Sequence, residues 1–159
     1  MSLTITSSAF SNGGAIPAKH TCEGADQSPP LAWSGVPAAA RSVVLIVDDP
    51  DAPDPAAPQR IWVHWVLYNL PPSVTGLPEA VARKALPPGT LEGVTDFGRT
   101  GWGGPCPPAG DKPHRYNFTV YALKVEKLDL PANATASLTG FTVNGNALGK
   151  ATFTGTFGR

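Results

Sequence analysis

Apolar and polar residues alternate along several short stretches of the chain, which is the pattern of half-buried β-strands. Leu3–Thr6 alternates and predicts a first strand at a sheet edge, and Ala151–Phe157 alternates and predicts a last strand. The 17 glycines and 18 prolines are spread along the chain. This distribution favours many turns between short strands over long helices.

Three longer apolar stretches predict the main strands. Ser42–Val47 is apolar on both faces and rich in β-branched residues, as in a central strand buried on both sides. Ile61–Leu70 is the strongest strand pattern, and Tyr116–Val125 is another. Strict alternation along Ile61–Leu70 places four side chains on one face of the predicted strand: Trp62, His64, Val66 and Tyr68.

The remaining segments are less regular. Residues 73–100 are weakly patterned and predict a long excursion with one short strand near Gly93–Thr95. The stretch Asn133–Leu148 is ambiguous, but Asn133 or Thr135 is suited to cap a short helix. We therefore predict a mainly β protein, an antiparallel β-sandwich with one or two short helices, as a single domain over residues 1–159.

Composition narrows the class of protein. A chain of 159 residues with 42% hydrophobic residues suffices for one core. The 12 basic and 12 acidic residues give no net charge, which argues against a nucleic-acid partner. Two cysteines are too few for a disulfide framework, and neither a signal peptide nor a transmembrane segment is recognisable. We therefore predict a cytoplasmic protein with reduced thiols.

An acidic cluster follows the predicted central strand. Asp48 and Asp54 are interpreted as members of a solvated turn, because Asp and Pro are common turn formers. Asp49, nearest the strand end, is a candidate site residue. His64 is the lone titratable group of an apolar strand, a situation that is more often structural. Convergence with Asp49 and His114 would give it a functional role.

A Gly/Pro-rich loop, Gly101–Pro113, leads into the strand that carries His114 and Tyr116. Its glycines permit close approach of the backbone, and its prolines fix φ. The few remaining amides, such as that of Cys106, are suited to bind an anion. His114 and Tyr116 share one strand face, so the loop and strand together predict a small polar pocket.

No segment of the sequence satisfies a standard cofactor-binding motif. The segment Gly145–Ala151 is one residue too short for a P-loop and lacks the metal-binding hydroxyl. The Gly101–Cys106 segment lacks the third glycine of a dinucleotide fingerprint. There is no nucleophile elbow, C-x-x-C pair or H-E-x-x-H sequence, so no cofactor is predicted. Two histidines and a carboxylate are nevertheless ligands that Zn²⁺ accepts.

Four segments in order resemble the phosphatidylethanolamine-binding protein family, in particular its bacterial Raf-kinase-inhibitor-like branch. They are Asp49–Pro53, His64 in its strand, Gly104–Pro108 and His114–Tyr116. Ser28–Trp33 and Thr95–Gly98 also resemble that branch, so the resemblance covers nearly the whole chain. It implies a Greek-key β-sandwich with a small anion pocket at one end.

The resemblance also implies the roles of individual residues. Asp51 would hold the loop, and the other implied ligand-binding positions are Asp49, His64, Gly104, Cys106, Pro108, His114 and Tyr116. The family is described as binding phospholipid head groups or phosphorylated partners, and its eukaryotic members modulate kinases or act in signalling. Two positions depart from the pattern: Asn146 replaces a frequent histidine, and His20 replaces an expected aromatic residue, interpreted as surface variation.

Three functional hypotheses follow. The first is a non-enzymatic binding protein for small anionic, phosphorylated or zwitterionic ligands, or for phosphorylated side chains of partner proteins. The second is a hydrolase, metal-assisted or acid–base, that uses Asp49 with His64 or His114. The third is a homodimeric interaction protein with a vestigial pocket, whose contact face is supplied by Trp62, Trp65 and Trp102. Cys106 is interpreted as an inert packing residue, with a reactive thiol as the alternative.

Overall fold

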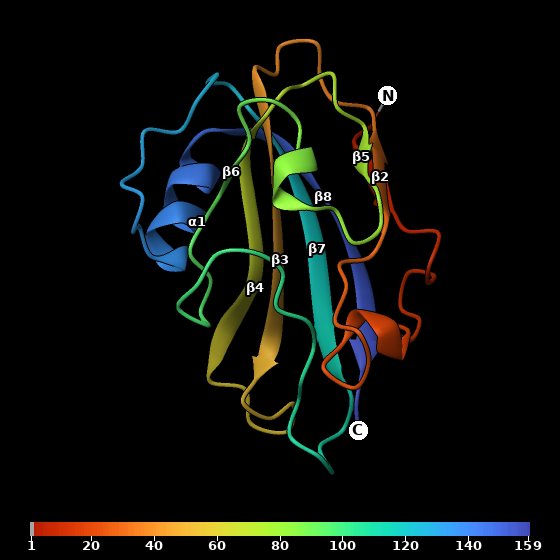
Figure 1. The fold of residues 1–159 in the computed structure, drawn as a ribbon. Coiled ribbons are helices and arrows are strands. Elements are labelled where there is room, and N and C mark those ends of the chain that lie inside the picture. The colour runs from red at the N-terminus through yellow and green to blue at the C-terminus, as the bar shows by residue number, and fades with distance from the viewer. Residues whose placement is uncertain (1) are drawn as a thin grey trace.

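A computed structural model describes residues 2–159, which form eight strands, one α-helix and two 3₁₀ turns (Figure 1). The strands are β1 (Thr4–Thr6), β2 (Leu31–Ser34), β3 (Ser42–Ala52), β4 (Arg60–Leu70), β5 (Gly76–Leu77), β6 (Leu91–Glu92), β7 (His114–Leu123) and β8 (Ala147–Phe157). The helices are η1 (Ala18–His20), η2 (Arg83–Ala85) and α1 (Ala136–Gly145).

The strands form two antiparallel sheets. One sheet has the order β1-β2-β5, and the other has the order β6-β4-β3-β7-β8. In the larger sheet β3, β4 and β6 are successive neighbours, and β7 returns after a long connection to pair with β3. This arrangement is a Greek key. The mainly β, antiparallel two-sheet fold predicted from the sequence is confirmed.

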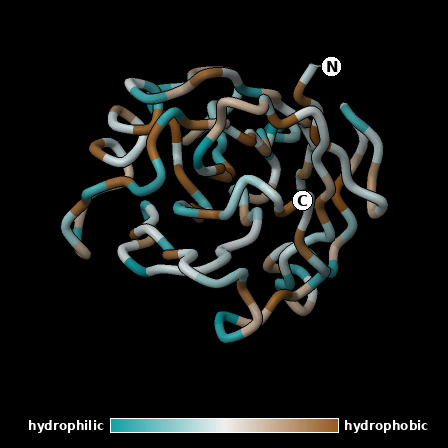
Figure 2. Tube along the Cα trace, turned by 90° about the horizontal axis from the view of Figure 1, so that it is seen from above, coloured by the Kyte–Doolittle hydropathy of each residue, from teal (hydrophilic) through white to brown (hydrophobic). Residues whose placement is uncertain are grey.

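The larger sheet is covered on both faces, which explains the apolar character of its central strands. One face packs against β1, β2 and β5 around Trp33, Leu45, Trp65 and Phe118. The other face packs against α1, whose Val143 joins Ile46 and Tyr121. Figure 2 shows hydrophobic and hydrophilic segments interspersed along the chain, with hydrophilic segments at the tips of several outer loops. The prediction that Ser42–Val47 is a central strand buried on both sides is therefore confirmed.

β3 continues further than the sequence suggested. It extends through the acidic cluster to Ala52, so Asp48, Asp49 and Asp51 are strand residues. The interpretation of Asp48 as part of a solvated turn is wrong, because pairing with Asn117 of β7 keeps the chain extended there. The prolines are accommodated because the pairing of β3 with β4 is irregular between Asp49 and Ala52.

A β-bulge in β4 changes which side chains share a face. Val47 pairs with Trp65 and Asp48 pairs with Val63, which leaves His64 as the extra residue. Strict alternation is thereby broken, and Val66 packs in the cluster beneath α1 while His64 contacts Tyr116 on the opposite face. The prediction that Trp62 and His64 share a face with Val66 and Tyr68 is wrong, because the bulge places the His64 side chain on the opposite face of the sheet from Val66.

The irregular segments also have defined structures. Thr135 caps α1 by accepting a hydrogen bond from the Leu138 amide, as one of the two predicted alternatives requires. The excursion over residues 73–100 contains β5, η2 and β6. Both short strands come before Gly93–Thr95, where one short strand was predicted. At that position the structure has only an isolated bridge between Val94 and Thr100.

A disulfide joins Cys22 to Cys106 across 84 residues of sequence. The prediction of reduced thiols is wrong, and so are both readings of Cys106 as a free thiol, because the fold brings the two sulfur atoms together. The predicted cytoplasmic location loses the support of reduced cysteines, since disulfides are favoured in oxidising compartments. Within residues 2–159, no helix is long and apolar enough to span a membrane.

Candidate ligand pocket

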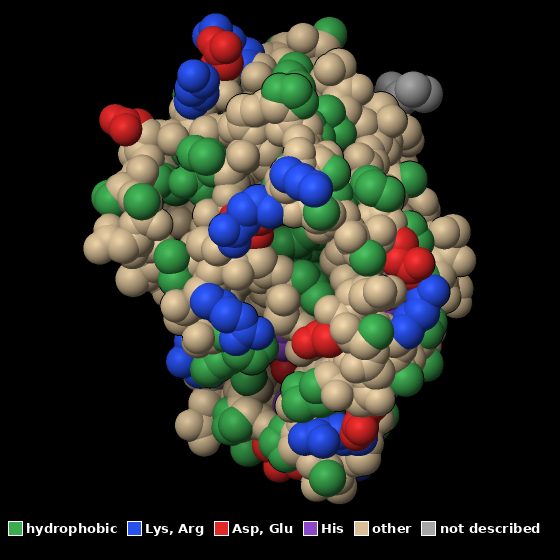
Figure 3. All heavy atoms as spheres, viewed as in Figure 1, with side chains coloured by type: hydrophobic (Ala, Val, Ile, Leu, Met, Phe, Trp, Pro, Cys, Tyr) green, Lys and Arg blue, Asp and Glu red, His purple; other side chains and the backbone are tan. Residues whose placement is uncertain are grey.

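A cavity of about 230 Å³ lies at the end of the larger sheet, on the face that packs against the smaller sheet. Figure 3 shows a hollow in the lower half of the molecule with histidine and acidic atoms at its floor. The lining residues come from β3, β4, β7 and the adjoining loops: Asp49, Ala52, Pro53, Trp62, His64, Phe97, Cys106, Pro107, Pro108, His114 and Tyr116.

Asp49 is the acidic centre of the cavity and is almost fully buried. One carboxylate oxygen accepts a hydrogen bond from the Asp51 amide at 2.7 Å. The other accepts one from Nδ1 of His114 at 2.7 Å. Asp49 therefore holds the end of β3 in shape and fixes the orientation of the His114 ring.

His114 donates through both ring nitrogens. Its Nε2 lies 3.0 Å from a carboxylate oxygen of Asp111, in addition to the contact of Nδ1 with Asp49. Burial opposes protonation of the ring, but hydrogen bonds and charges from Asp111 and Asp49 outweigh it and raise the pKa of His114. A ring that donates from both nitrogens is an imidazolium, so the cavity contains a fixed positive charge.

His64 has a different environment and a different protonation state. Its Nδ1 donates to the Gly103 carbonyl at 2.5 Å, and this bond leaves Nε2 as the nitrogen available to a ligand. Burial lowers the pKa of His64, although the Gly103 carbonyl and the charges of Asp49, Asp26 and Asp96 oppose the change. His64 is therefore neutral near pH 7, with an acceptor at Nε2.

Tyr116 contributes a hydroxyl group between the two histidines. Its ring lies edge-on to His64, at 5.3 Å between centroids, and stacked on His114, at 6.4 Å. Burial raises its pKa, as do the nearby charges of Asp49 and Asp51. The hydroxyl thus stays protonated and is a donor for an anionic group.

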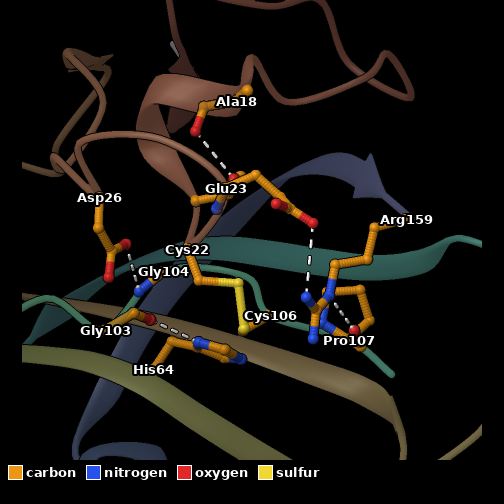
Figure 4. Close-up of a disulfide and its surroundings, with 11 residues drawn as sticks. Ala18, Cys22, Glu23, Asp26, His64, Gly103, Gly104, Cys106, Pro107 and Arg159 are labelled. Carbon is orange, nitrogen blue, oxygen red and sulfur yellow. Dashed lines mark hydrogen bonds and ion pairs between the residues drawn. A yellow bond between two sulfur atoms is a disulfide. The ribbon is translucent and has the colours of Figure 1, made fainter. Parts of the chain in front are cut away.

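The Gly/Pro loop closes the cavity because several contacts fix it to the N-terminal segment (Figure 4). Besides the disulfide, the Cys22 amide donates to the Pro105 carbonyl at 3.1 Å, and the Gly104 amide donates to Asp26 at 3.0 Å. A Cβ at position 104 would lie 2.0 Å from the Asp26 carboxylate, so only glycine fits. Gly104 thus positions the loop without lining the cavity.

Asp51 also lies outside the cavity. Its carboxylate accepts hydrogen bonds from the backbone amide and the guanidinium of Arg115, at 2.8 to 3.0 Å. The side-chain hydrogen bond from Arg115 lowers the pKa of Asp51, against the effect of burial. This pair fixes the end of β3 to the start of β7, which is the supporting role that the resemblance implies.

The structure brings together most of the predicted residues and adds others. Asp49, His64, Cys106, Pro108, His114 and Tyr116 all line the cavity. The aromatic wall residues Trp62 and Phe97 were not predicted, although strand alternation already placed Trp62 on the face of His64. Asp111 was also missed, because nothing in its local sequence shows that it reaches His114.

Three other expectations are corrected. Trp65 is buried and Trp102 packs against the core, so Trp62, Trp65 and Trp102 do not form an exposed contact face. His20 is fully buried and donates to the Gln27 carbonyl at 2.8 Å, and so it is no surface variation.

Asn146 caps the end of α1 through the Thr142 carbonyl and lies outside the cavity.

Comparisons with known proteins agree with this architecture. The family model described as phosphatidylethanolamine-binding protein matches residues 6–158. A UPF0098 protein of Methanothermobacter thermautotrophicus is 43% identical over 99% of both chains. The UPF0098 protein YbcL of Escherichia coli is 41% identical over 94% of this chain and 84% of its own length.

Solved structures agree as well. The crystal structure of Escherichia coli YbcL, described as a new member of the mammalian PEBP family, superimposes with a TM-score of 0.91 and 39% identity, covering 100% of this chain and 99% of the other. A phosphatidylethanolamine-binding protein homologue from Chlamydia trachomatis gives a TM-score of 0.86 and 38% identity, with coverage of 99% and 98%. This chain belongs to the phosphatidylethanolamine-binding protein family.

Proposed function

We propose that this protein is a non-enzymatic binding protein whose cavity holds a small phosphorylated head group that also carries an ammonium group. The observation that carries the proposal is the convergence of the His114 imidazolium, the His64 Nε2 atom and the Tyr116 hydroxyl in one small cavity. The imidazolium and the hydroxyl are donors to phosphate oxygens, and Nε2 of neutral His64 accepts a hydrogen bond from a monoprotonated phosphate.

The charge balance favours a zwitterion over a simple anion. Asp49 and Asp111 flank the single positive charge of His114, so the three groups together carry one negative charge. A phosphate oxygen that displaces Asp111 would accept the hydrogen bond from Nε2 of His114. The released Asp111 carboxylate would then be available to the ammonium group of the same ligand.

Binding is better supported than hydrolysis. Asp49 already accepts two hydrogen bonds, and both nitrogens of His114 already donate to carboxylates. Neither group is free to take a proton from an attacking water molecule, which leaves Nε2 of His64 as the candidate base for a hydrolase. The hydrolase hypothesis requires turnover of a generic phosphomonoester such as p-nitrophenyl phosphate, and that turnover should be lost in a His64→Gln variant.

NMR titrations of the imidazole signals test the proposal. We expect O-phosphoethanolamine to shift the signals of His64 and His114 saturably and to leave those of His20, which lies outside the cavity, unchanged. A His64→Gln variant that remains folded by circular dichroism should bind about tenfold more weakly, since it loses one hydrogen bond to a charged group. Unperturbed His64 and His114 signals at saturating ligand would refute the proposal.

Two sources of the ligand are separable in the same experiment. N-acetyl phosphoserine amide presents the phosphate of a modified protein side chain without a primary ammonium group. Phosphoethanolamine presents the head group of a lipid with its ammonium. Tighter binding of phosphoethanolamine supports a lipid-type head group, whereas tighter binding of the phosphoserine compound supports a phosphorylated protein partner.

A further inference from the structure

A second cavity lies on the opposite face of the larger sheet, beneath α1. It has a volume of about 360 Å³ and shares no lining residue with the first cavity. Ile46, Val63 and Tyr121 contribute to its floor from three adjacent strands, and one wall is formed by α1. The second cavity is therefore a groove between helix and sheet that the proposed function does not use.

The groove has an apolar mouth. Ile61 of β4 and Phe141 of α1 line it from opposite sides, and they are 56% and 80% exposed. Large apolar side chains left this exposed on both sides of a cavity are typical of a ligand-binding groove.

Gly140 keeps the groove open. It lines the cavity from the interior of α1, and a Cβ built there would meet no atom within 4 Å. Glycine is unfavourable inside a helix compared with every residue except proline. A larger side chain at this position would occupy the groove.

Asp48 places a half-buried carboxylate in this apolar environment. Within residues 2–159 no hydrogen bond or ion pair satisfies it, whereas Asp96, the other acid of the groove, pairs with Arg60 at 3.0 Å and with the Val63 amide at 2.6 Å. Burial and then the charge of Asp49 raise the pKa of Asp48 to about 6, against the opposing charge of Lys150. A half-buried carboxylate that has no hydrogen-bond partner and faces apolar side chains favours a cationic ligand.

We propose that this groove binds a small amphipathic cation, an arylalkyl or alkyl primary amine, with its ammonium group at Asp48 and its apolar body between Ile61 and Phe141. Tyr121 adds an aromatic surface near the ammonium position. The complementarity of charge and of apolar surface defines the ligand class. This site is independent of the phosphate-binding cavity.

The test is a titration of the full chain with 2-phenylethylamine, followed by amide NMR shifts. We expect saturable shifts at groove residues, with the His64 and His114 signals unchanged. The neutral analogue 2-phenylethanol and the anionic analogue 3-phenylpropionate should bind at least tenfold more weakly. Equal affinity for the three compounds, or the absence of saturable shifts at groove residues, would overturn the proposal.

Variants test separately the carboxylate of Asp48 and the open space at Gly140. Asp48→Asn should lose at least tenfold in affinity for 2-phenylethylamine, and Gly140→Leu should abolish binding by filling the groove. Asp129→Asn, which removes an exposed carboxylate outside the groove, is the charge-matched control and should bind as wild type does. An Asp48→Asn variant that binds like the control would contradict the assignment of the ammonium position.

Discussion

The arrangement of charges around His114 is the most specific feature at the level of single residues. Asp111 occupies Nε2 of the ring, the position at which an external phosphate would bind. If the cavity binds phosphate as we propose, a carboxylate in that position competes with small anions. The sequence shows Asp111 only as one polar residue of a loop, and its contact with His114 depends on how the loop folds.

Replacing Asp111 should therefore change ligand preference. We expect Asp111→Asn to bind inorganic phosphate about tenfold more tightly than wild type, because a hydrogen bond to a charged group no longer has to be broken. The advantage of phosphoethanolamine over phosphate should shrink at the same time, because the carboxylate for its ammonium group is lost. Calorimetric titration with both ligands measures the two effects.

Asp54→Asn provides the control for net charge, since Asp54 lies in the neighbouring turn and does not line the cavity. It should leave both affinities close to those of wild type. If Asp111→Asn bound phosphate no better than Asp54→Asn did, Asp111 would not be a competitor of the ligand.

Asp48 should lower the stability of the protein at neutral pH. Its pKa is raised by burial to about 6 in the folded state, so the folded state binds a proton more tightly than the unfolded state does. Stability then increases as pH falls from about 6 toward 4. The ionised carboxylate costs at most about 3 kcal/mol, and partial exposure to solvent reduces this to about 1–2 kcal/mol.

We therefore expect Asp48→Asn to unfold at higher urea concentration than wild type at pH 7.5, with a smaller difference at pH 4.5. Urea titrations at the two pH values measure the change. The combination of higher stability with weaker amine binding is informative, because misfolding cannot explain the loss of binding. Equal stability of Asp48→Asn and wild type at pH 7.5 would show that Asp48 is well solvated.

At the level of secondary structure, the strands were predictable where hydrophobic pattern and local propensity agree. β4 and β7 coincide closely with apolar stretches of the sequence, and β3 begins where its apolar stretch begins. The bulge at His64 was not predictable, because it arises from how β4 pairs with β3 and with the following loop. The extension of β3 through Asp48 and Asp49 was missed because these residue types favour turns, and pairing with β4 and β7 overrides that preference.

The disulfide was missed for a related reason. Cys22 and Cys106 lie in two irregular segments, and only the packing of these segments against each other brings the sulfur atoms together. Two cysteines so far apart in sequence carry no local signal of pairing. The bond fixes the loop that closes the cavity around His114.

We expect the Cys22→Ser/Cys106→Ser double variant to be less stable than wild type by about 2–4 kcal/mol, because the bond closes a long loop in the unfolded chain. Reduction of wild type with dithiothreitol should reproduce this loss in urea unfolding and should leave the double variant unchanged. A double variant as stable as oxidised wild type would indicate that the bond does not constrain the unfolded chain.

At the level of the whole molecule, the two faces of the larger sheet carry the two cavities, and β3 supplies a carboxylate to each. Asp49 faces the cavity around His114, and the adjacent Asp48 faces the groove beneath α1. The alternation of side chains along a strand accounts for this division. The sequence predicted the first cavity because its residues lie in recognisable segments, whereas the groove combines residues from segments with no common pattern.

His114 should also make the stability of the whole molecule depend on pH. Because its pKa is raised in the folded state by Asp111 and Asp49 against the effect of burial, the folded state retains the proton that the unfolded state loses above about pH 6.5. The stabilisation is fully present below that pH and is lost as pH rises through the folded pKa. Wild type should therefore become progressively less stable on the alkaline side of neutrality.

His114→Gln should remove this dependence, because glutamine keeps a hydrogen-bond donor but does not titrate. We expect its free energy of unfolding to be lower than that of wild type at pH 6 and the difference to decrease steadily toward pH 9. Urea titrations at intervals across this range measure the difference, and His64→Gln serves as the comparison because the pKa of His64 is shifted the other way. A constant difference between His114→Gln and wild type would mean that the two carboxylates do not hold His114 as an imidazolium, and the proposed phosphate site would then lack its positive charge.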